Sequence, residues 1–205
     1  DGARQNNKVF HHNATNLIDP SLLKATRASA GVAAADDGPG ALGGSLAYET
    51  VDVGDLLAPG DSLGGFLDGR YASNGDTVTS AGSVFGRANG FEALGYVKHT
   101  DGNDYEDGNG DTVPSRWRKW NGDLAAGWTP DADSLLEFSA GKGDGEARYA
   151  GRGMDGTQFA RESLGLRFEK LNLGQISKLE AQVYYNYADH IMDNFRLRSP
   201  DPTSM

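Results

Sequence analysis

Apolar and polar residues alternate with a period of two along much of this chain, most clearly over residues 178–192, KLEAQVYYNYADHIM. Successive residues of a β-strand point to opposite faces, so this pattern predicts a strand with two different faces. One face would carry Leu179, Ala181, Val183, Tyr185 and Tyr187. The other would carry Glu180, Gln182, Tyr184, Asn186, Ala188, His190 and Met192. An apolar, aromatic-ended face opposite a polar face is typical of a strand in a membrane barrel.

A rhythm of strand, turn and strand begins at residue 61 and predicts about seven strands. They are 62–72, 77–87, 91–100, 116–128, 134–142, 161–171 and 178–192. After the first turn at 73–76, short connections alternate with long ones at 101–115 and 143–160. Membrane barrels have short periplasmic turns and longer external loops, so we expect His190 and Met192 near the external rim.

The segment 116–128 supports a membrane strand, because Trp120, Leu124, Ala126 and Trp128 share one face. Two Trp residues at this spacing lie roughly 20 Å apart along the membrane normal, close to the height of the apolar band. A soluble sandwich with two buried Trp side chains is the alternative. A plugged barrel needs about 22 strands, so about seven predict part of a larger protein.

Residues 1–60 have a different pattern, which predicts a separate segment ahead of the barrel strands of residues 61–205. Asp19 and Pro20 are suited to the first turn of a helix, which we expect to end near Gly31. A glycine-rich turn at 36–44 and a short apolar strand at 45–53 follow. The expected fold is therefore dominated by β-structure, an antiparallel barrel portion preceded by part of an α/β domain.

Composition narrows the functional classes. The net charge of −10 argues against nucleic acid as a partner, because neutralising phosphates requires basic patches. The chain has no cysteine, which rules out disulfides and thiolate chemistry, and no apolar run long enough for a membrane helix. Hydrophobic residues make up only 38% of the 205, as suits a barrel with a wet interior. No nucleophile–base motif is present, so we expect no enzyme.

Three groups of residues are candidates for metal chemistry. His190 and Met192 share a strand face, and imidazole with thioether is a ligand pair suited to copper. The adjacent His11 and His12 could provide an axial ligand to haem iron. Asp101, Asp104, Asp107 and Asp111 lie in an acidic loop that could bind Ca²⁺, although the spacing fails the EF-hand pattern. Each group has a simpler interpretation as a rim pair, a solvated loop pair or a solvated acidic loop.

The residues resemble a TonB-dependent outer-membrane receptor, in two branches of that family. Residues 1–60 are similar to the late plug domain of haem and haemoglobin receptors, through DGARQ (1–5), LIDPSLLK (17–24) and GPGALGGSLAYETVDVGDLL (38–57). The resemblance implies that His11 or His12 is an axial haem ligand.

Residues 103–205 are similar to the copper receptors of the same family. The matching stretches are NDYEDGNGDTVPSRWRKWN (103–121), GWTPDADSLLE (127–137), GDGEARYAGRGMDGTQFARESLGLRFEK (143–170) and YYNYADHIMDNFRLR (184–198). The resemblance implies that His190 and Met192 bind copper together with a plug Cys and Met, and this chain holds no Cys.

Together the two resemblances imply a receptor in the outer membrane of a Gram-negative bacterium, surrounded by lipid and energised by the TonB complex. It would take up a metal nutrient, with copper preferred and haem or haemoprotein as the alternative. A hypothesis of another class is a soluble, Ca²⁺-stabilised β-rich adhesion or binding module.

Overall fold

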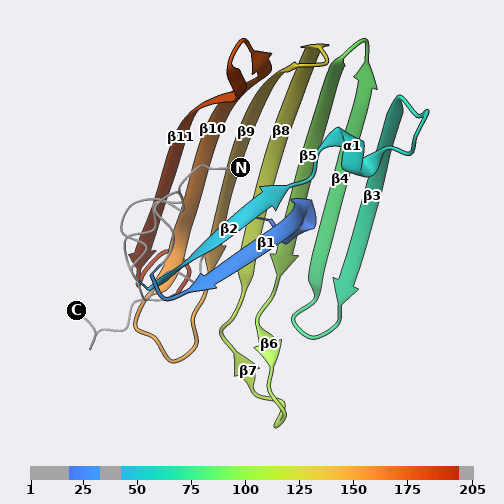
Figure 1. The fold of residues 1–205 in the computed structure, drawn as a ribbon. Helices are drawn as coiled ribbons and strands as arrows, with labels where there is room; N and C mark the ends of the chain where they lie inside the picture. Colours follow the sequence, from blue (N-terminus) through green and yellow to red (C-terminus); the bar gives the residue numbers. More distant parts are fainter. Residues whose placement is uncertain (1–18, 33–42, 199–205) are drawn as a thin grey trace.

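The computed structural model describes residues 19–32 and 43–198. Seven long strands form one curved antiparallel sheet in the order β11-β10-β9-β8-β5-β4-β3, so each lies beside its neighbours in sequence (Figure 1). Their bounds are β3 Leu63–Ala72, β4 Thr77–Ala88, β5 Phe91–Gly102, β8 Trp117–Asp131, β9 Ser134–Ala147, β10 Asp155–Leu173 and β11 Ile176–Asp193. The predicted β-dominated fold is confirmed, but across the described ranges the sheet does not close, since β3 and β11 are its two edges.

Six of the seven long strands are longer than their sequence patterns predicted, and β3 is one residue shorter. The expected bounds of the long loop at 143–160 are wrong, because β9 continues to Ala147 and β10 begins at Asp155, which leaves a connection at 148–154. The other long connection contains a small hairpin, β6 (Tyr105–Glu106) and β7 (Thr112–Val113), which extends beyond the sheet (Figure 1). Backbone pairing with a neighbour therefore continues through polar, glycine-rich sequence that carries no alternation of its own.

Short turns join the strands at the opposite end of the sheet. Asn89 and Gly90, between β4 and β5, both have positive φ, at 52° and 78°. Consecutive positive φ values are typical of the two-residue turn whose twist matches antiparallel strands, and Asn-Gly is its preferred sequence. The predicted division into a short-turn end and a long-connection end is thus present in the sheet.

The predicted helix after Asp19 is wrong. Asp19 does cap a turn, accepting a hydrogen bond from the Ser21 backbone N–H (2.8 Å), but the turn is a single 3-10 turn over Pro20–Leu22. The chain then forms β1 (Leu23–Ala30), which pairs with β2 (Gly44–Thr50). Pairing with β2 satisfies the backbone of residues 23–30 and overrides their modest helix preference. A short helix that the pattern missed, α1 (Val53–Leu56), follows β2.

The β1–β2 hairpin lies across one face of the large sheet (Figure 1). A small apolar cluster joins them, with Leu22, Val53 and Leu57 packed against Phe85, Leu94 and Tyr96 of β4 and β5. Elsewhere this inner face carries mainly polar side chains. Arg167 on β10, for example, pairs with Glu137 on β9 (2.5 Å) and Glu180 on β11 (3.2 Å).

The opposite face of the sheet is an exposed apolar surface. Five apolar side chains of this outer face, one from each of five strands, are between 44% and 72% exposed: Val84, Leu124, Phe138, Leu166 and Val183. Trp120 and Trp128 share this face as predicted, and Trp128 stacks on Phe91 at a centroid distance of 5.5 Å. No helix in the described ranges is long and apolar enough to cross a membrane.

Candidate metal-binding site at the long-connection end

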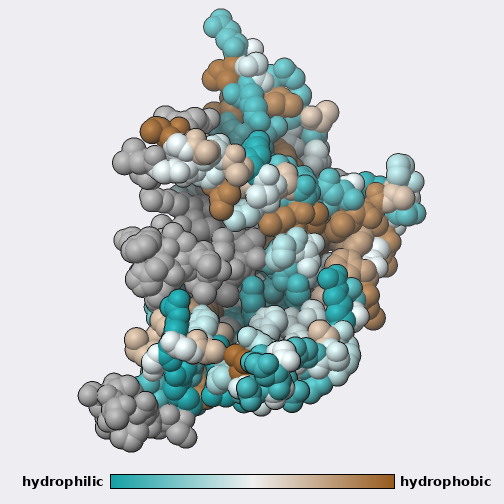
Figure 2. Space-filling view, turned by 90° about the horizontal axis from the view of Figure 1, so that it is seen from below, coloured by the Kyte–Doolittle hydropathy of each residue, from teal (hydrophilic) through white to brown (hydrophobic). Residues whose placement is uncertain are grey.

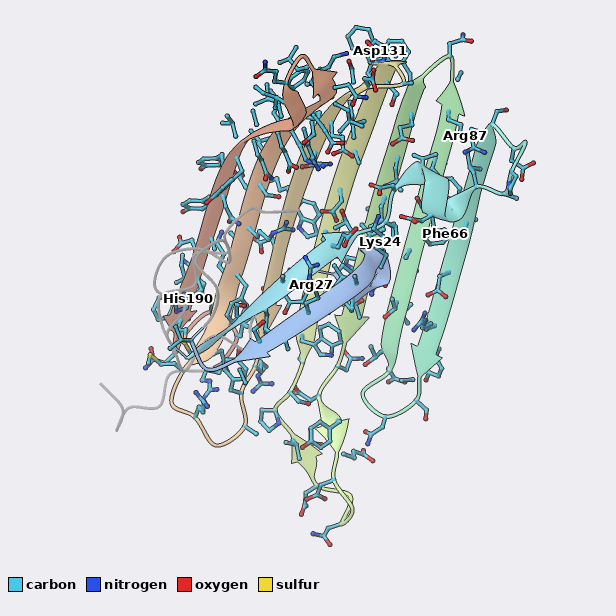
Figure 3. The ribbon with its side chains drawn as sticks, in the orientation of Figure 1. Lys24, Arg27, Phe66, Arg87, Asp131 and His190 are labelled. Carbon is cyan, nitrogen blue, oxygen red and sulfur yellow. The ribbon has the colours of Figure 1, made fainter. Side chains whose placement is uncertain are left out.

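His190 lies on β11 near the end of the sheet that carries the long connections (Figure 3), and Met192 follows it two residues later on the same strand. Both are partly exposed and project from the same face of the strand. Their Cα atoms are separated by two strand rises, about 6.6 Å, which lets an imidazole and a thioether converge on one ion. The structure thus places this pair on the polar inner face, and it supplies two soft donors of the kind that suit copper.

The neighbouring strand presents an apolar surface to this pair. Phe159 of β10 is paired in register with His190, and Gly156 is paired with Met192. The rings of Phe159 and His190 are nearly parallel, with planes inclined by 9° and centroids 6.3 Å apart. Phe159 is only 8% exposed, so its ring is a fixed part of the surroundings of His190.

The chain directly after Met192 is held by buried carboxylates. Asp193 accepts hydrogen bonds from the Thr157 hydroxyl (2.8 Å) and from the backbone of Phe195 and Arg196. Asp155, which is fully buried, forms a bidentate pair with the Arg198 guanidinium. Hydrogen bonding to Asp155 raises the pKa of Arg198 and outweighs the opposing effect of burial. These contacts fix the end of β11 against the 148–154 connection.

The carboxylates of the acidic loop accept hydrogen bonds that shape the loop, and they do not converge on one point. Asp104 accepts backbone hydrogen bonds from Ser115 (2.8 Å) and Arg116 (2.7 Å) and pairs with Arg148 (2.6 Å). Burial opposes ionisation of Asp104, but those donors and the Arg148 charge outweigh it and lower its pKa. Asp107 accepts from the backbone of Asn109 and Asp111 and so shapes the hairpin turn.

The remaining predicted residues stay outside such a cluster. Asp101 lies within β5 and Asp111 beside β7. In residues 19–32 and 43–198, no three His, Cys, Asp or Glu side chains gather as a metal site, so the acidic loop does not form a carboxylate cage. His11 and His12 lie outside the described residues.

A largely buried ion pair joins the 19–22 turn to the sheet. Lys98 of β5 pairs with Asp19 at 3.1 Å and also donates to the Ser21 hydroxyl at 3.2 Å. The Asp19 side chain is 3% exposed. Burial raises the pKa of Asp19, but hydrogen bonds from Ser21 and the Lys98 charge outweigh it, and the net pKa is lowered. Asp19 is therefore a buried carboxylate held in its ionised form.

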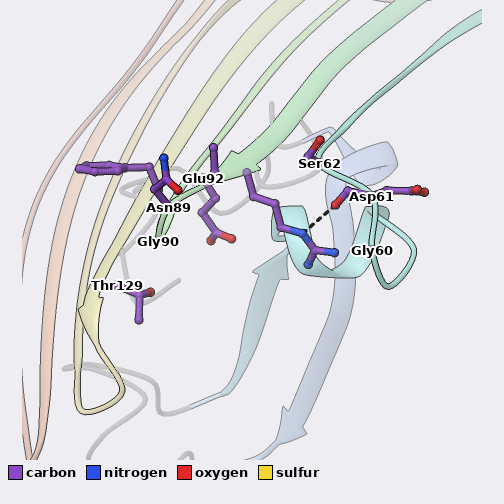
Figure 4. A pocket seen from close by; sticks show the side chains of 10 residues that line it. Gly60, Asp61, Ser62, Asn89, Gly90, Glu92 and Thr129 are labelled. Carbon is purple, nitrogen blue, oxygen red and sulfur yellow. Dashed lines mark hydrogen bonds between the residues drawn. The ribbon is translucent and has the colours of Figure 1, made fainter.

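The segment joining α1 to β3 is attached at the short-turn end of the sheet. Arg87 donates to the carbonyl oxygens of Asp61 and Ala58, both at 3.0 Å. An open pocket lies beside these contacts (Figure 4). Its lining includes Gly60, Ser62, Asn89, Glu92 and Thr129. This pocket is at the other end of the sheet from His190.

Sequence reasoning missed Phe159, whose ring lies beside His190, and the Asp155–Arg198 pair, which holds the chain that follows β11. Phe159 sits in the segment GMDGTQF, which was expected to be part of a loop. A register shift between Gly156 and Gln158 turns this segment into a bulged strand. Glycine close to an aromatic residue in such a segment was the available signal, since glycine within strands often marks a bulge or a close approach.

Comparisons with known proteins identify the relatives of the chain. No protein-family model matches it. The heme transporter BhuA of Brucella ovis is 31% identical over 214 residues, which cover 97% of this chain and 31% of that protein. The hemin receptor of Yersinia pestis is 35% identical over 140 residues, covering 68% of this chain and 20% of that protein.

The similar solved structures are also transporters, but their names refer to copper or iron instead of heme. The copper transporter OprC matches with a TM-score of 0.76 and 49% identity, covering 90% of this chain and 29% of OprC. The FrpB iron transporter of Neisseria meningitidis (F3-3 variant) matches with a TM-score of 0.72 and 26% identity, over 84% of this chain and 30% of FrpB. The chain spans about a third of the length of these relatives.

Proposed function

The homologues of this chain are TonB-dependent outer-membrane receptors of Gram-negative bacteria, and from that premise we propose that it forms part of a receptor that takes up copper. Residues 1–60 would be the late part of the plug and residues 61–205 the first strands of the barrel. The apolar outer face would contact lipid, and the β1–β2 hairpin would lie in the barrel lumen. The remaining strands and the segment that binds TonB belong to parts of the receptor beyond these 205 residues.

The observation that carries the copper assignment is the His190–Met192 pair on the inner face at the long-connection end. With short turns on the periplasmic side, this end faces the outside, where a nutrient arrives. Thioether sulfur favours Cu(I), and imidazole binds copper in either oxidation state. Identity of 49% with a copper transporter over 90% of the chain supports the same cargo. Further donors would come from plug residues that precede Asp1.

Copper binding by the full-length receptor in detergent tests this assignment. We expect His190→Ala and Met192→Ala each to weaken Cu(I) binding at least tenfold in competition with bicinchoninate, a chromogenic Cu(I) chelator. His99→Ala is a matched control, because His99 pairs with Trp120 on the lipid-facing side. Unchanged Cu(I) affinity in both site variants would show that the pair is not part of a copper site.

Haem is the second candidate, favoured by 31% identity with a heme transporter over 97% of the chain. In that case His11 or His12 would ligate haem iron, and a double His11→Ala, His12→Ala variant would lose the Soret shift seen on adding haemin. A receptor whose Soret shift depends on His11 and His12, and whose Cu(I) affinity does not depend on His190, would be a haem receptor.

A further inference from the structure

Phe159 lies on the inner face of β10, away from the apolar outer face and outside the apolar cluster that joins the hairpin to the sheet. Phe159 is a large aromatic side chain, 8% exposed, among the polar side chains of this face. Its ring is parallel to the His190 imidazole within 9°. It is the cross-strand partner of His190, so the two side chains leave the sheet side by side.

Gly156 makes room for this ring. A Cβ atom at position 156 would overlap the Cζ and Cε2 atoms of Phe159. The φ angle of Gly156 is not among the positive values that only glycine adopts readily, so the backbone does not require glycine here. Gly156 is therefore explained by the space that the ring occupies. Since Gly156 is paired with Met192, the ring extends from His190 toward the level of Met192.

The backbone that carries Phe159 is itself fixed. The shift in pairing between Gly156 and Gln158 leaves Thr157 as the extra residue of a bulge. Thr157 and Asp193 are both 8% exposed and are joined by a 2.8 Å hydrogen bond from β10 to the end of β11. The bulge re-aims the residues that follow it, and the hydrogen bond holds it beside the strand that carries both candidate ligands.

We propose that Phe159 is a positioning residue for His190, a role that rests on the proposed copper site. A ring stacked against one side of the imidazole limits its rotation and so orders the nitrogen donor before the ion arrives. Ordering a ligand in advance strengthens binding, because less freedom is lost on association. The ring also places an apolar surface, free of oxygen ligands, next to two soft donors. That environment favours Cu(I) over hard divalent cations.

The test is Cu(I) affinity of the full-length receptor in detergent, with bicinchoninate as competitor. We expect Phe159→Ala to weaken binding about tenfold and Phe159→Tyr, which keeps the ring, to leave it within twofold. Phe159→Leu keeps a large apolar side chain without an aromatic face, so it should preserve thermal stability but weaken binding as Phe159→Ala does. Phe168→Ala is the matched control, since Phe168 lies on the same strand but on the lipid-facing side.

A double-mutant cycle separates positioning from a structural role. If Phe159 acts through His190, its removal has no further effect on Cu(I) affinity in a His190→Ala background. Equal losses in both backgrounds, or wild-type affinity in Phe159→Leu, would overturn the proposal. The copper assignment fails separately, when His190→Ala and Met192→Ala leave affinity unchanged. A receptor in which those two variants lose copper while Phe159→Leu does not would retain the site and lose only the positioning role.

Discussion

The pair between Asp19 and Lys98 is the contact whose removal gives the sharpest stability prediction. It joins the turn before β1 to strand β5, far apart in sequence. Replacing Lys98 with Met keeps an unbranched apolar side chain of similar length and removes only the ammonium group. The Asp19 carboxylate, 3% exposed, then keeps its hydrogen bonds from Ser21 but loses the compensating charge of the ammonium group.

The expected cost follows from the burial of the two side chains. Removing one partner of a buried ion pair typically costs about 3–5 kcal/mol, because the other charge stays buried without compensation. Lys98 is 22% exposed, so some water reaches the pair, and we expect the lower end, about 3 kcal/mol. At about 1.4 kcal/mol for each factor of ten, this loss increases the population of the undocked hairpin about 100-fold.

Hydrogen exchange of the full-length receptor in detergent measures this population. Amides of β1 and β2 that exchange through undocking should exchange about 100-fold faster in Lys98→Met, while amides of β8 to β10 should not change. Replacing Asp19 with Asn in the same chain should restore part of the protection, because no orphan charge remains. Lys142→Met is the matched control, since Lys142 forms an exposed pair with Glu162 away from the hairpin.

Unchanged exchange of β1 and β2 in Lys98→Met would refute the reasoning. It would mean that the apolar cluster around Leu22, Val53 and Leu57 holds the hairpin by itself. Equal acceleration in the sheet strands would also refute it, because the loss would then be one of global stability rather than docking.

Three further predictions concern the pH dependence of hairpin docking, the outer face of the sheet and the chain that follows β11. The folded-state pKa of Asp19 lies below its ordinary value of 3.8, so hairpin docking measured by exchange should be constant from pH 8 to pH 5 and weaken only as acid protonates Asp19 below that value. Leu124→Arg on the lipid-facing side should lower the free energy of folding into lipid vesicles by about 2–4 kcal/mol, whereas Ser139→Arg on the inner face should cost far less; equal losses would contradict the assigned faces. Arg198→Met leaves Asp155 buried without its guanidinium, so limited proteolysis should cut the 148–154 connection sooner than in wild type, and an unchanged cleavage rate would contradict the role of this pair.

Strand positions were predictable because each sheet face has one environment. Residues of the exposed apolar outer face alternate with residues of the mainly polar inner face, and this alternation is present within single segments such as 178–192. The strand ends were not predictable in the same way. Residues 143–147 and 155–160 form strand in polar and glycine-rich sequence, because pairing with β8 and β11 supplies their backbone hydrogen bonds.

Some residues of the candidate site could be predicted from the sequence, and others only from the structure, for the same reason. His190 and Met192 could be selected from the sequence because their two-residue spacing is a local property of one strand. Phe159 could not, since its approach to His190 depends on the pairing of β10 with β11 and on the bulge at Thr157. For the same reason Asp155 and Arg198, 43 residues apart, show no sequence pattern that links them.

By itself, the sequence determined the period-two faces, the division into short and long connections, and the presence of a soft-ligand pair on a polar face. These are properties of neighbouring residues, and the physics of strand geometry makes them visible in one dimension. Tertiary structure decided that residues 23–30 form a strand rather than a helix, which charges are buried together, and which ring stacks on His190. Those outcomes depend on backbone pairing and desolvation between distant segments, which no local pattern encodes.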